Sequence, residues 1–206
     1  MRDRGFSIVI GVMLALTLAG CGLEVQNLGI PAQGDNQTEG GLPATGEPEV
    51  ERPAFHFRSG TLELGDFVYE DIKDNLFDPC QEISAEEFAK IGFKSTGQTQ
   101  NLRDVEGLSC PMTSSDSMNG YALGTIPVSL KELEASGVDS AVGVSDVVPG
   151  LFTYRGRERA GLSCVAAVDT ERGQLGAIVG VGLEETDYDA LCAKAVDIME
   201  SLYKIV

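Results

Sequence analysis

LSCVAAVDTERGQLGAIVGV, residues 162–181, is the stretch that decides the fold. It contains two apolar runs, Leu162–Val168 and Leu175–Val181, separated by the polar segment Asp169–Gly173. Apolar runs of this length, joined by a short segment that contains glycine, are typical of a β-hairpin. The stretch therefore predicts two neighbouring antiparallel strands.

A helix is predicted directly after this hairpin. Thr186 and Asp189 offer a capping box, and the apolar residues beyond them recur at three- and four-residue spacing. These residues are Tyr188, Leu191, Cys192, Ala195, Ile198, Met199 and Leu202. Such spacing places them on one face, which we expect to pack on the hairpin. That packing would bring Cys192 close to Cys164 in the first strand.

Capping signals predict two shorter helices earlier in the chain. Ser84 and Glu87 form a capping box for a helix that Gly92 ends. Ser129 begins a second helix, which Gly137 ends. The residues between Asp66 and Asp78 are expected to form a polar, acidic loop.

Alternating and apolar runs predict the remaining strands. They cover Phe55–Phe57, Leu62–Leu64, Leu108–Thr113, Tyr121–Val128, Val144–Val148 and Leu151–Tyr154. Together with the helices they predict an α/β chain of the α+β type. We expect an antiparallel sheet with helices packed against it and two disulfides.

The N-terminus has the organisation of a lipoprotein signal. Arg2 and Arg4 precede the apolar run Phe6–Leu18, and Ala19 and Gly20 then precede Cys21. This pattern predicts a signal peptide over residues 1–20 and lipid, such as palmitate, on Cys21. An ordinary signal peptide or a short membrane anchor is the alternative, but the apolar run is shorter than the roughly 20 residues of a spanning helix. We expect the protein on the extracytoplasmic face of the cell membrane.

Residues 21–53 read as the lipidated cysteine and a disordered tether, and residues 54–206 as a single domain. The tether is rich in Gly, Pro, Gln, Asn and Glu and has no hydrophobic periodicity. Leu42–Gly46 matches the sortase recognition string LPxTG. A sorting signal lies at the C-terminus and is followed by an apolar stretch, and neither holds for this string. We interpret it as linker composition.

Four further cysteines, Cys80, Cys110, Cys164 and Cys192, remain after Cys21. An even number in an exported chain predicts disulfides, and four cysteines allow three connectivities. No CxxC pair or neighbouring histidine is present in the sequence, so no zinc site is predicted. The sequence predicts no cofactor.

Charge excludes one class of partner. The formal net charge is −17, and such a surface repels nucleic acid. Arg155, Arg157 and Arg159 form the one basic cluster, which could contact an anionic wall polymer or an envelope protein. The acidic residues between Asp66 and Asp78 fit no EF-hand and are interpreted as a solvated loop.

Catalytic motifs are missing from the sequence. His56 is the only histidine, and it lies between Phe55 and Phe57, where an exposed strand position is expected. No GxSxG elbow, P-loop or GxGxxG string occurs. Gly176 and Gly180 are expected to serve close packing in their strand. We therefore expect no enzymatic activity.

The order of these motifs resembles a known family. A lipobox and tether, the run Phe77–Cys80 before a helix that ends at Gly92, and then Cys110, Cys164 and Cys192 resemble the exported actinobacterial lipoproteins of domain of unknown function 3558. The resemblance covers about residues 76–206, and it departs at Met112, where the family often has an aromatic residue. It implies an α/β domain in an actinobacterial envelope and no established activity.

These observations predict a lipid-anchored, non-catalytic binding or interaction module of the cell envelope. The alternative is a carrier of an apolar envelope ligand, which would need a deep apolar cavity, and an enzyme acting on the cell wall is less favoured. A solid core beneath the final helix would favour the binding module. We expect the disulfides Cys80–Cys110 and Cys164–Cys192, each closing a loop of about 30 residues.

Overall fold

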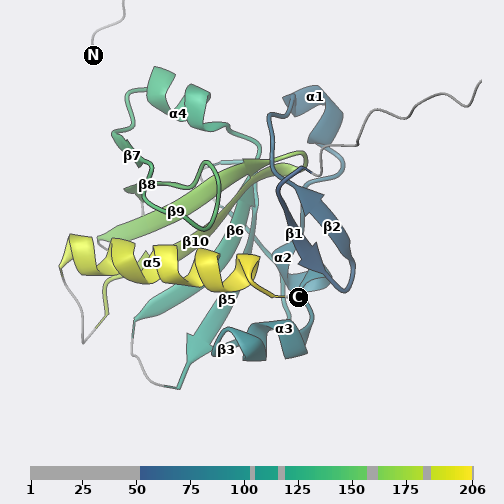
Figure 1. Ribbon diagram of the computed structural model, residues 1–206, viewed down its shortest axis with the longest axis vertical. Coiled ribbons are helices and arrows are strands. Elements are labelled where there is room, and N and C mark those ends of the chain that lie inside the picture. The colour runs from purple at the N-terminus through teal and green to yellow at the C-terminus, as the bar shows by residue number, and fades with distance from the viewer. Residues whose placement is uncertain (1–51, 103–104, 116–118, 157–161, 183–186, 206) are drawn as a thin grey trace, which may run out of the picture. The chain divides into compact units, whose positions relative to one another are not determined.

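The computed structural model describes residues 52–102, 105–115, 119–156, 162–182 and 187–205 (Figure 1). Its centre is the hairpin of β9 (Ser163–Thr170) and β10 (Gly173–Gly180), paired in register from Thr170 opposite Gly173 to Ser163 opposite Gly180. Gly173 has a φ of 103°, a left-handed conformation that glycine adopts without strain at this turn. The predicted hairpin is confirmed.

Six further strands extend this hairpin into an eight-stranded antiparallel sheet. The order is β3-β5-β6-β10-β9-β8-β7, and β4 also pairs with β5. The strands are β3 (Phe93–Ser95), β4 (Gln100–Asn101), β5 (Leu108–Ser114), β6 (Gly120–Ile126), β7 (Ser140–Val142) and β8 (Phe152–Arg155). The α+β class and the antiparallel sheet are therefore confirmed.

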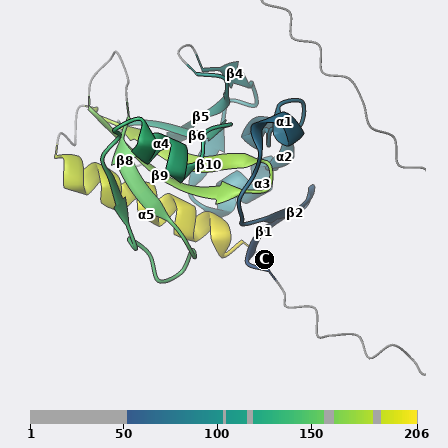
Figure 2. The same ribbon diagram turned by 90° about the horizontal axis from the view of Figure 1, so that it is seen from above.

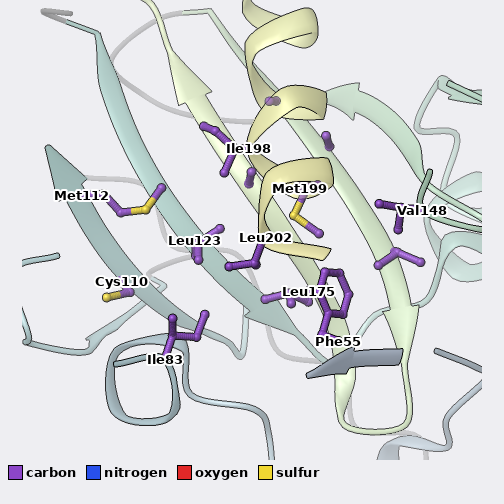
Figure 3. Packing of buried hydrophobic residues seen from close by; sticks show 14 of the residues in the cluster. Phe55, Ile83, Cys110, Met112, Leu123, Val148, Leu175, Ile198, Met199 and Leu202 are labelled. Carbon is purple, nitrogen blue, oxygen red and sulfur yellow. The ribbon is translucent and has the colours of Figure 1, made fainter. Parts of the chain in front are cut away.

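Helix α5 (Tyr188–Tyr203) packs its apolar face on one side of the sheet (Figure 3). Leu191, Ala195, Met199 and Leu202 are all fully buried there. They meet side chains from alternate positions of the strands, namely Cys110, Leu123, Cys164, Ala166, Val168, Leu175, Ala177 and Val179. Asp187 is the N-cap, because its side chain accepts a hydrogen bond from the Ala190 backbone N–H at 3.0 Å.

The capping box predicted at Ser84 is present, and the helix start predicted at Ser129 has one as well. The box predicted for the final helix is not confirmed, because Asp187 is its N-cap and Thr186 lies outside the described residues. In α3 (Ala85–Lys90), Ser84 and Glu87 cap each other's backbone, and Gly92 follows with a φ of 83°. In α4 (Leu130–Ala135), Ser129 and Glu132 do the same. Each box pairs two backbone N–H groups that a helix start otherwise leaves without partners.

Three local predictions were wrong. The expected acidic loop contains a short helix, α1 (Tyr69–Ile72), and a helical turn, α2 (Pro79–Glu82), precedes α3. The strand expected at Val144–Val148 lies earlier, as β7. Val148 is instead a buried residue of the core, after a turn in which Ser145 Oγ accepts hydrogen bonds from the Val147 and Val148 backbone N–H groups.

A separate hairpin, β1 (Ala54–Phe57) and β2 (Gly60–Glu63), closes one end of the core. Phe55 meets Tyr203 of α5 edge to face, with ring centroids 5.2 Å apart. Phe57 stacks on Phe77 with centroids 5.4 Å apart. Aromatic pairs at these separations add to the burial of their apolar surface.

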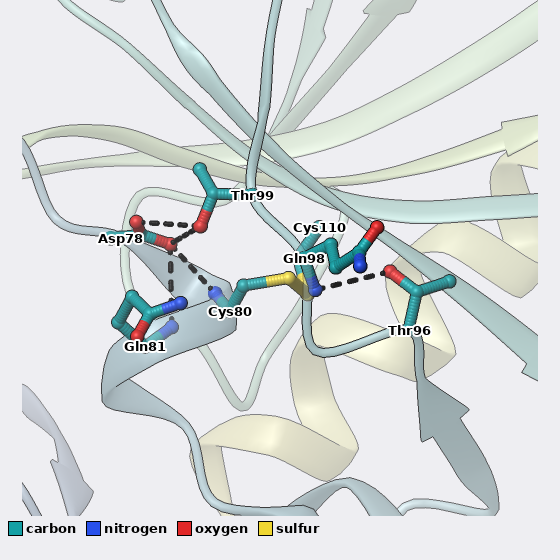
Figure 4. The surroundings of a disulfide bond; sticks show 7 residues. All are labelled: Asp78, Cys80, Gln81, Thr96, Gln98, Thr99 and Cys110. Carbon is teal, nitrogen blue, oxygen red and sulfur yellow. Dashed lines mark hydrogen bonds between the residues drawn. A yellow bond between two sulfur atoms is a disulfide. The ribbon is translucent and has the colours of Figure 1, made fainter.

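Both predicted disulfides are present. Cys80 in α2 bonds to Cys110 in β5, and Cys164 in β9 bonds to Cys192 in α5. Asp78 positions Cys80: its Oδ1 accepts hydrogen bonds from the Cys80 N–H at 2.9 Å and from the Thr99 hydroxyl at 2.9 Å (Figure 4). One disulfide therefore fixes α2 to the sheet, and the other fixes α5.

No helix among the described residues has the length and apolar character needed to cross a membrane. Residues 1–20 and Cys21 lie outside the described residues, as does the tether up to residue 51. The signal peptide, the lipid on Cys21 and the domain limits remain predictions.

Candidate functional site

The sheet has a second face, on the side away from α5. Figure 2 shows α5 on one side of the sheet and α4 with β4 on the other. On this second face Phe152, Val165 and Ala167 form a small apolar cluster, against which Leu130 and Leu133 of the α4 region pack. Strand β9 is therefore covered on both faces, which explains why its apolar run is almost uninterrupted.

A groove of about 680 Å³ lies on this second face. Its floor is formed by β6, β9 and β10, one wall by α4 with the segment after it, and the other wall by β4 with the β4–β5 segment. Apolar lining residues include Leu102, Ile126, Leu133, Val138, Val165 and Ile178. Small-molecule sites are commonly of this size and lined in this way.

Glycines shape the floor of the groove. A Cβ at Gly176 would lie 3.0 Å from the Ala167 Cβ, and one at Gly124 would lie 3.3 Å from the Ile178 Cδ1. The predicted close packing is thus confirmed for Gly176. At Gly180 an added Cβ would meet only the Gly120 carbonyl oxygen, at 3.8 Å, so packing does not require glycine there.

A buried hydrogen-bond network connects the floor to the α4 wall. The Tyr154 hydroxyl donates to the Gln174 Oε1 at 3.1 Å, and the Gln174 Nε2 donates to the Val128 carbonyl at 2.8 Å. The Asp169 carboxylate accepts a hydrogen bond from the Leu130 backbone N–H at 3.1 Å. Because Val128 and Leu130 lie at the start of α4, these bonds hold that wall in place.

Burial changes the acidity of two groups in this network. Desolvation raises the pKa of Tyr154, and the nearby Asp169 carboxylate raises it further. Desolvation also raises the pKa of Asp169, although hydrogen bonds from Leu130 and Gln174 oppose the shift. The Tyr154 hydroxyl therefore stays neutral and remains a hydrogen-bond donor over the physiological pH range.

The charge of the groove differs from that of the chain. No aspartate or glutamate is among its lining residues within the described part of the chain, although the net charge is −17. Arg155 borders the groove, but it is paired with Cys164 in the β8–β9 register, and its guanidinium lies 4.0 Å from the ring centroid of Tyr188 in α5, on the other face of the sheet. The groove is thus a largely apolar surface on an acidic protein.

The volume beneath α5 is filled. Leu191, Leu202 and Met199 have no exposed surface, and Ile198 is 5% exposed. An apolar carrier was expected to have its cavity on this side, under the final helix. The structure places the groove on the opposite face of the sheet instead.

The other residues considered from the sequence do not converge on a site. His56 is exposed on β1, with its Nδ1 3.4 Å from the Thr61 hydroxyl. No group of three or more His, Cys, Asp or Glu side chains among the described residues is placed to hold a metal ion. Arg157 and Arg159 lie outside the described residues, so the basic cluster is represented by Arg155 alone.

Sequence reasoning missed the groove. The signal was present as glycines four residues apart, Gly120 and Gly124 in β6 and Gly176 and Gly180 in β10. Residues two or four apart in a strand lie on the same face, and paired strands bring Gly124 opposite Gly176 and Gly120 opposite Gly180. Gly124 and Gly176 line the groove, where glycines in register on two paired strands leave the sheet face without side chains.

The comparisons with known proteins agree with the order of motifs in the sequence. Neither curated proteins nor solved structures provide a match. The family described as a protein of unknown function, DUF3558, matches residues 16–204. Because that match covers nearly the whole chain, the protein belongs to the DUF3558 family.

Proposed function

We propose that this protein is a non-catalytic binding module and that the groove on the second face of the sheet takes a small apolar ligand. The observation that carries the proposal is the apolar lining of a groove of about 680 Å³ on a strongly acidic chain. Burying an apolar ligand there would remove both the ligand and the lining side chains from water. The hydrogen bonds of Tyr154 and Gln174 would hold the floor and the α4 wall of the groove in place before a ligand binds.

The proposal includes a location. The N-terminal pattern that ends at Cys21 supports a lipoprotein anchored at the extracytoplasmic face of the membrane, in an actinobacterial envelope as the family resemblance implies. A lipid anchor would keep the groove near ligands of the envelope. Cys21→Ala should abolish labelling by a radioactive fatty acid and release the protein from the membrane fraction. Normal labelling and fractionation of that variant would contradict the anchor.

Binding is tested with N-phenyl-1-naphthylamine, a neutral probe that fluoresces in apolar sites. The mature chain carrying Cys21→Ala avoids both the lipid and detergent. Titration of this chain with the probe should give a fluorescence increase that saturates. Ile178→Trp should abolish it, because Ile178 is a half-buried residue of the groove and the larger ring would fill the space.

Two variants make this experiment interpretable. Val142→Trp adds the same ring at a residue of β7 that is 65% exposed and does not line the groove, so probe binding should stay unchanged. Val138→Trp fills the groove from its rim and guards against misfolding of the Ile178 variant. Equal probe binding by all three variants would overturn the proposed function.

A further inference from the structure

Ser163 is a buried residue whose hydroxyl has no partner within the described part of the chain. It has no exposed surface, and it lines the groove at the start of β9. Leaving a buried hydroxyl without a hydrogen bond destabilises a folded protein. A buried hydroxyl without a partner calls for an explanation, and a bound ligand that accepts its hydrogen bond is one.

A glycine lies beside the Ser163 hydroxyl. The Gly156 backbone N–H donates to the Ser163 carbonyl at 3.0 Å, so the two residues lie side by side on β8 and β9. A Cβ at position 156 would lie only 2.2 Å from the Ser163 Oγ. Glycine at position 156 therefore places no side chain of its own against the hydroxyl, whereas any other residue would occupy the position of a hydrogen-bond partner.

The other polar groups nearby are already engaged. The Tyr154 hydroxyl donates to Gln174, and the Gln174 amide donates to the Val128 carbonyl. Among the lining residues that are fully buried, Ser163 is thus the one whose side-chain donor lacks an acceptor within the described part of the chain. Among the described residues, the lining offers no carboxylate to a cationic head group. These features favour a ligand that ends in an oxygen acceptor.

We infer that Ser163 anchors an acyl compound in the groove by donating its hydroxyl hydrogen to the carbonyl or carboxylate oxygen, while the hydrocarbon chain lies along the apolar lining. The inference rests on the proposed function, because it names the ligand class of the same groove. The acyl group could belong to a free long-chain carboxylate or to an ester. The two share the acceptor oxygen and differ in charge.

The test measures displacement of N-phenyl-1-naphthylamine from the mature Cys21→Ala chain by dodecanoate, methyl dodecanoate and dodecane at pH 8. Ser163→Ala should weaken competition by the carboxylate, the ester or both about three- to ten-fold, the usual range for one hydrogen bond. Competition by dodecane should not change. If only competition by dodecanoate weakens, the ligand is a free acid. If only competition by methyl dodecanoate weakens, the ligand is an ester.

Thr125→Val is the matched control. Thr125 is also fully buried with an unpaired hydroxyl, but it does not line the groove. Both variants should raise the unfolding temperature of the ligand-free protein, because each removes an unsatisfied buried group. Only Ser163→Ala should change acyl binding, which separates an anchoring role from a structural one.

The outcomes distinguish the inference from the proposed function. Unchanged acyl affinity in Ser163→Ala, with probe binding still abolished by Ile178→Trp, would overturn the anchor and leave the groove as an apolar site. An equal loss for dodecane would also overturn it, because dodecane accepts no hydrogen bond. Absence of saturable probe binding by the parent chain would overturn the proposed function itself.

Discussion

Replacing Leu191 by alanine tests whether the space beneath α5 is a solid core. Leu191 is fully buried on the face of α5 that packs on β9 and β10. The neighbouring Cys192 is bonded to Cys164, so this turn of the helix is fixed to the sheet. The helix therefore has little freedom to move inward and fill the space that a smaller side chain leaves.

The size of the effect follows from two contributions. Removing roughly three methylene equivalents at about 0.8 kcal/mol each gives about 2.4 kcal/mol of lost transfer free energy. A residual cavity of roughly 40–80 Å³ at ~24 cal/mol per Å³ adds about 1–2 kcal/mol. We therefore expect Leu191→Ala to lower the free energy of unfolding by about 3–4.5 kcal/mol.

Urea unfolding of the mature Cys21→Ala chain with its disulfides intact measures this loss. The transition should move to lower urea with an unchanged slope, as for a pure change in stability. Val142→Ala is the control, because a side chain that is 65% exposed should contribute less than about 0.5 kcal/mol. A loss below about 1 kcal/mol for Leu191→Ala would refute the solid core and place an accommodating cavity under α5.

Three further predictions concern the ends, the charges and the acid stability of the domain. A chain starting at Arg52 keeps the Arg52–Glu63 ion pair and the hydrogen bond from the Leu64 N–H to the Pro53 carbonyl, so it should unfold at the same temperature as the full mature chain. A loss of several degrees would show that residues 22–51 pack on the domain. Arg172 donates to both carboxylate oxygens of Glu82, at 2.6 and 2.8 Å. Arg172→Met should therefore lower the free energy of unfolding in urea by about 2 kcal/mol. Parent-like stability of Arg172→Lys would contradict a role for the paired hydrogen bonds, because lysine cannot form them. Burial alone would raise the pKa of Glu87, but hydrogen bonds from Ser84 and Arg58 lower it overall. The ionised Glu87 therefore stabilises the folded protein above the unfolded pKa of about 4.3, and this stabilisation is lost as pH falls through the folded pKa. Glu87→Gln should therefore lose less stability than the parent protein between about pH 5 and pH 3 in thermal unfolding, and parallel pH profiles would contradict this assignment.

The sequence predicted the elements whose signals are local. Turn residues at Asp169–Gly173 mark the central hairpin, and the spacing of apolar residues from Tyr188 to Leu202 marks the buried face of α5. Ser84 with Glu87 marks a capping box through contacts three residues apart. Because these interactions lie close together in the chain, the sequence pattern is sufficient to identify them.

The groove depends on information that local patterns do not carry. Whether the second face of the sheet is covered is decided by where α4 lies, and α4 is positioned by contacts of Asp169 and Gln174 with residues about 40 positions earlier. The alternation of residues in β10 places Gly176 and Ile178 on one face but does not say what lies above them. The missed turn at α2 likewise depends on Asp78, whose carboxylate is also held by Thr99.

Methyl NMR on isoleucine-labelled mature Cys21→Ala chain tests the central claim most directly. Ile126 and Ile178 line the groove, whereas Ile83 and Ile198 lie in the core on the α5 side of the sheet. Titration with dodecanoate should shift the methyl signals of Ile126 and Ile178 in a saturable way and leave those of Ile83 and Ile198 in place. Saturable shifts at Ile198 with none at Ile178 would contradict the account and place the ligand beneath α5.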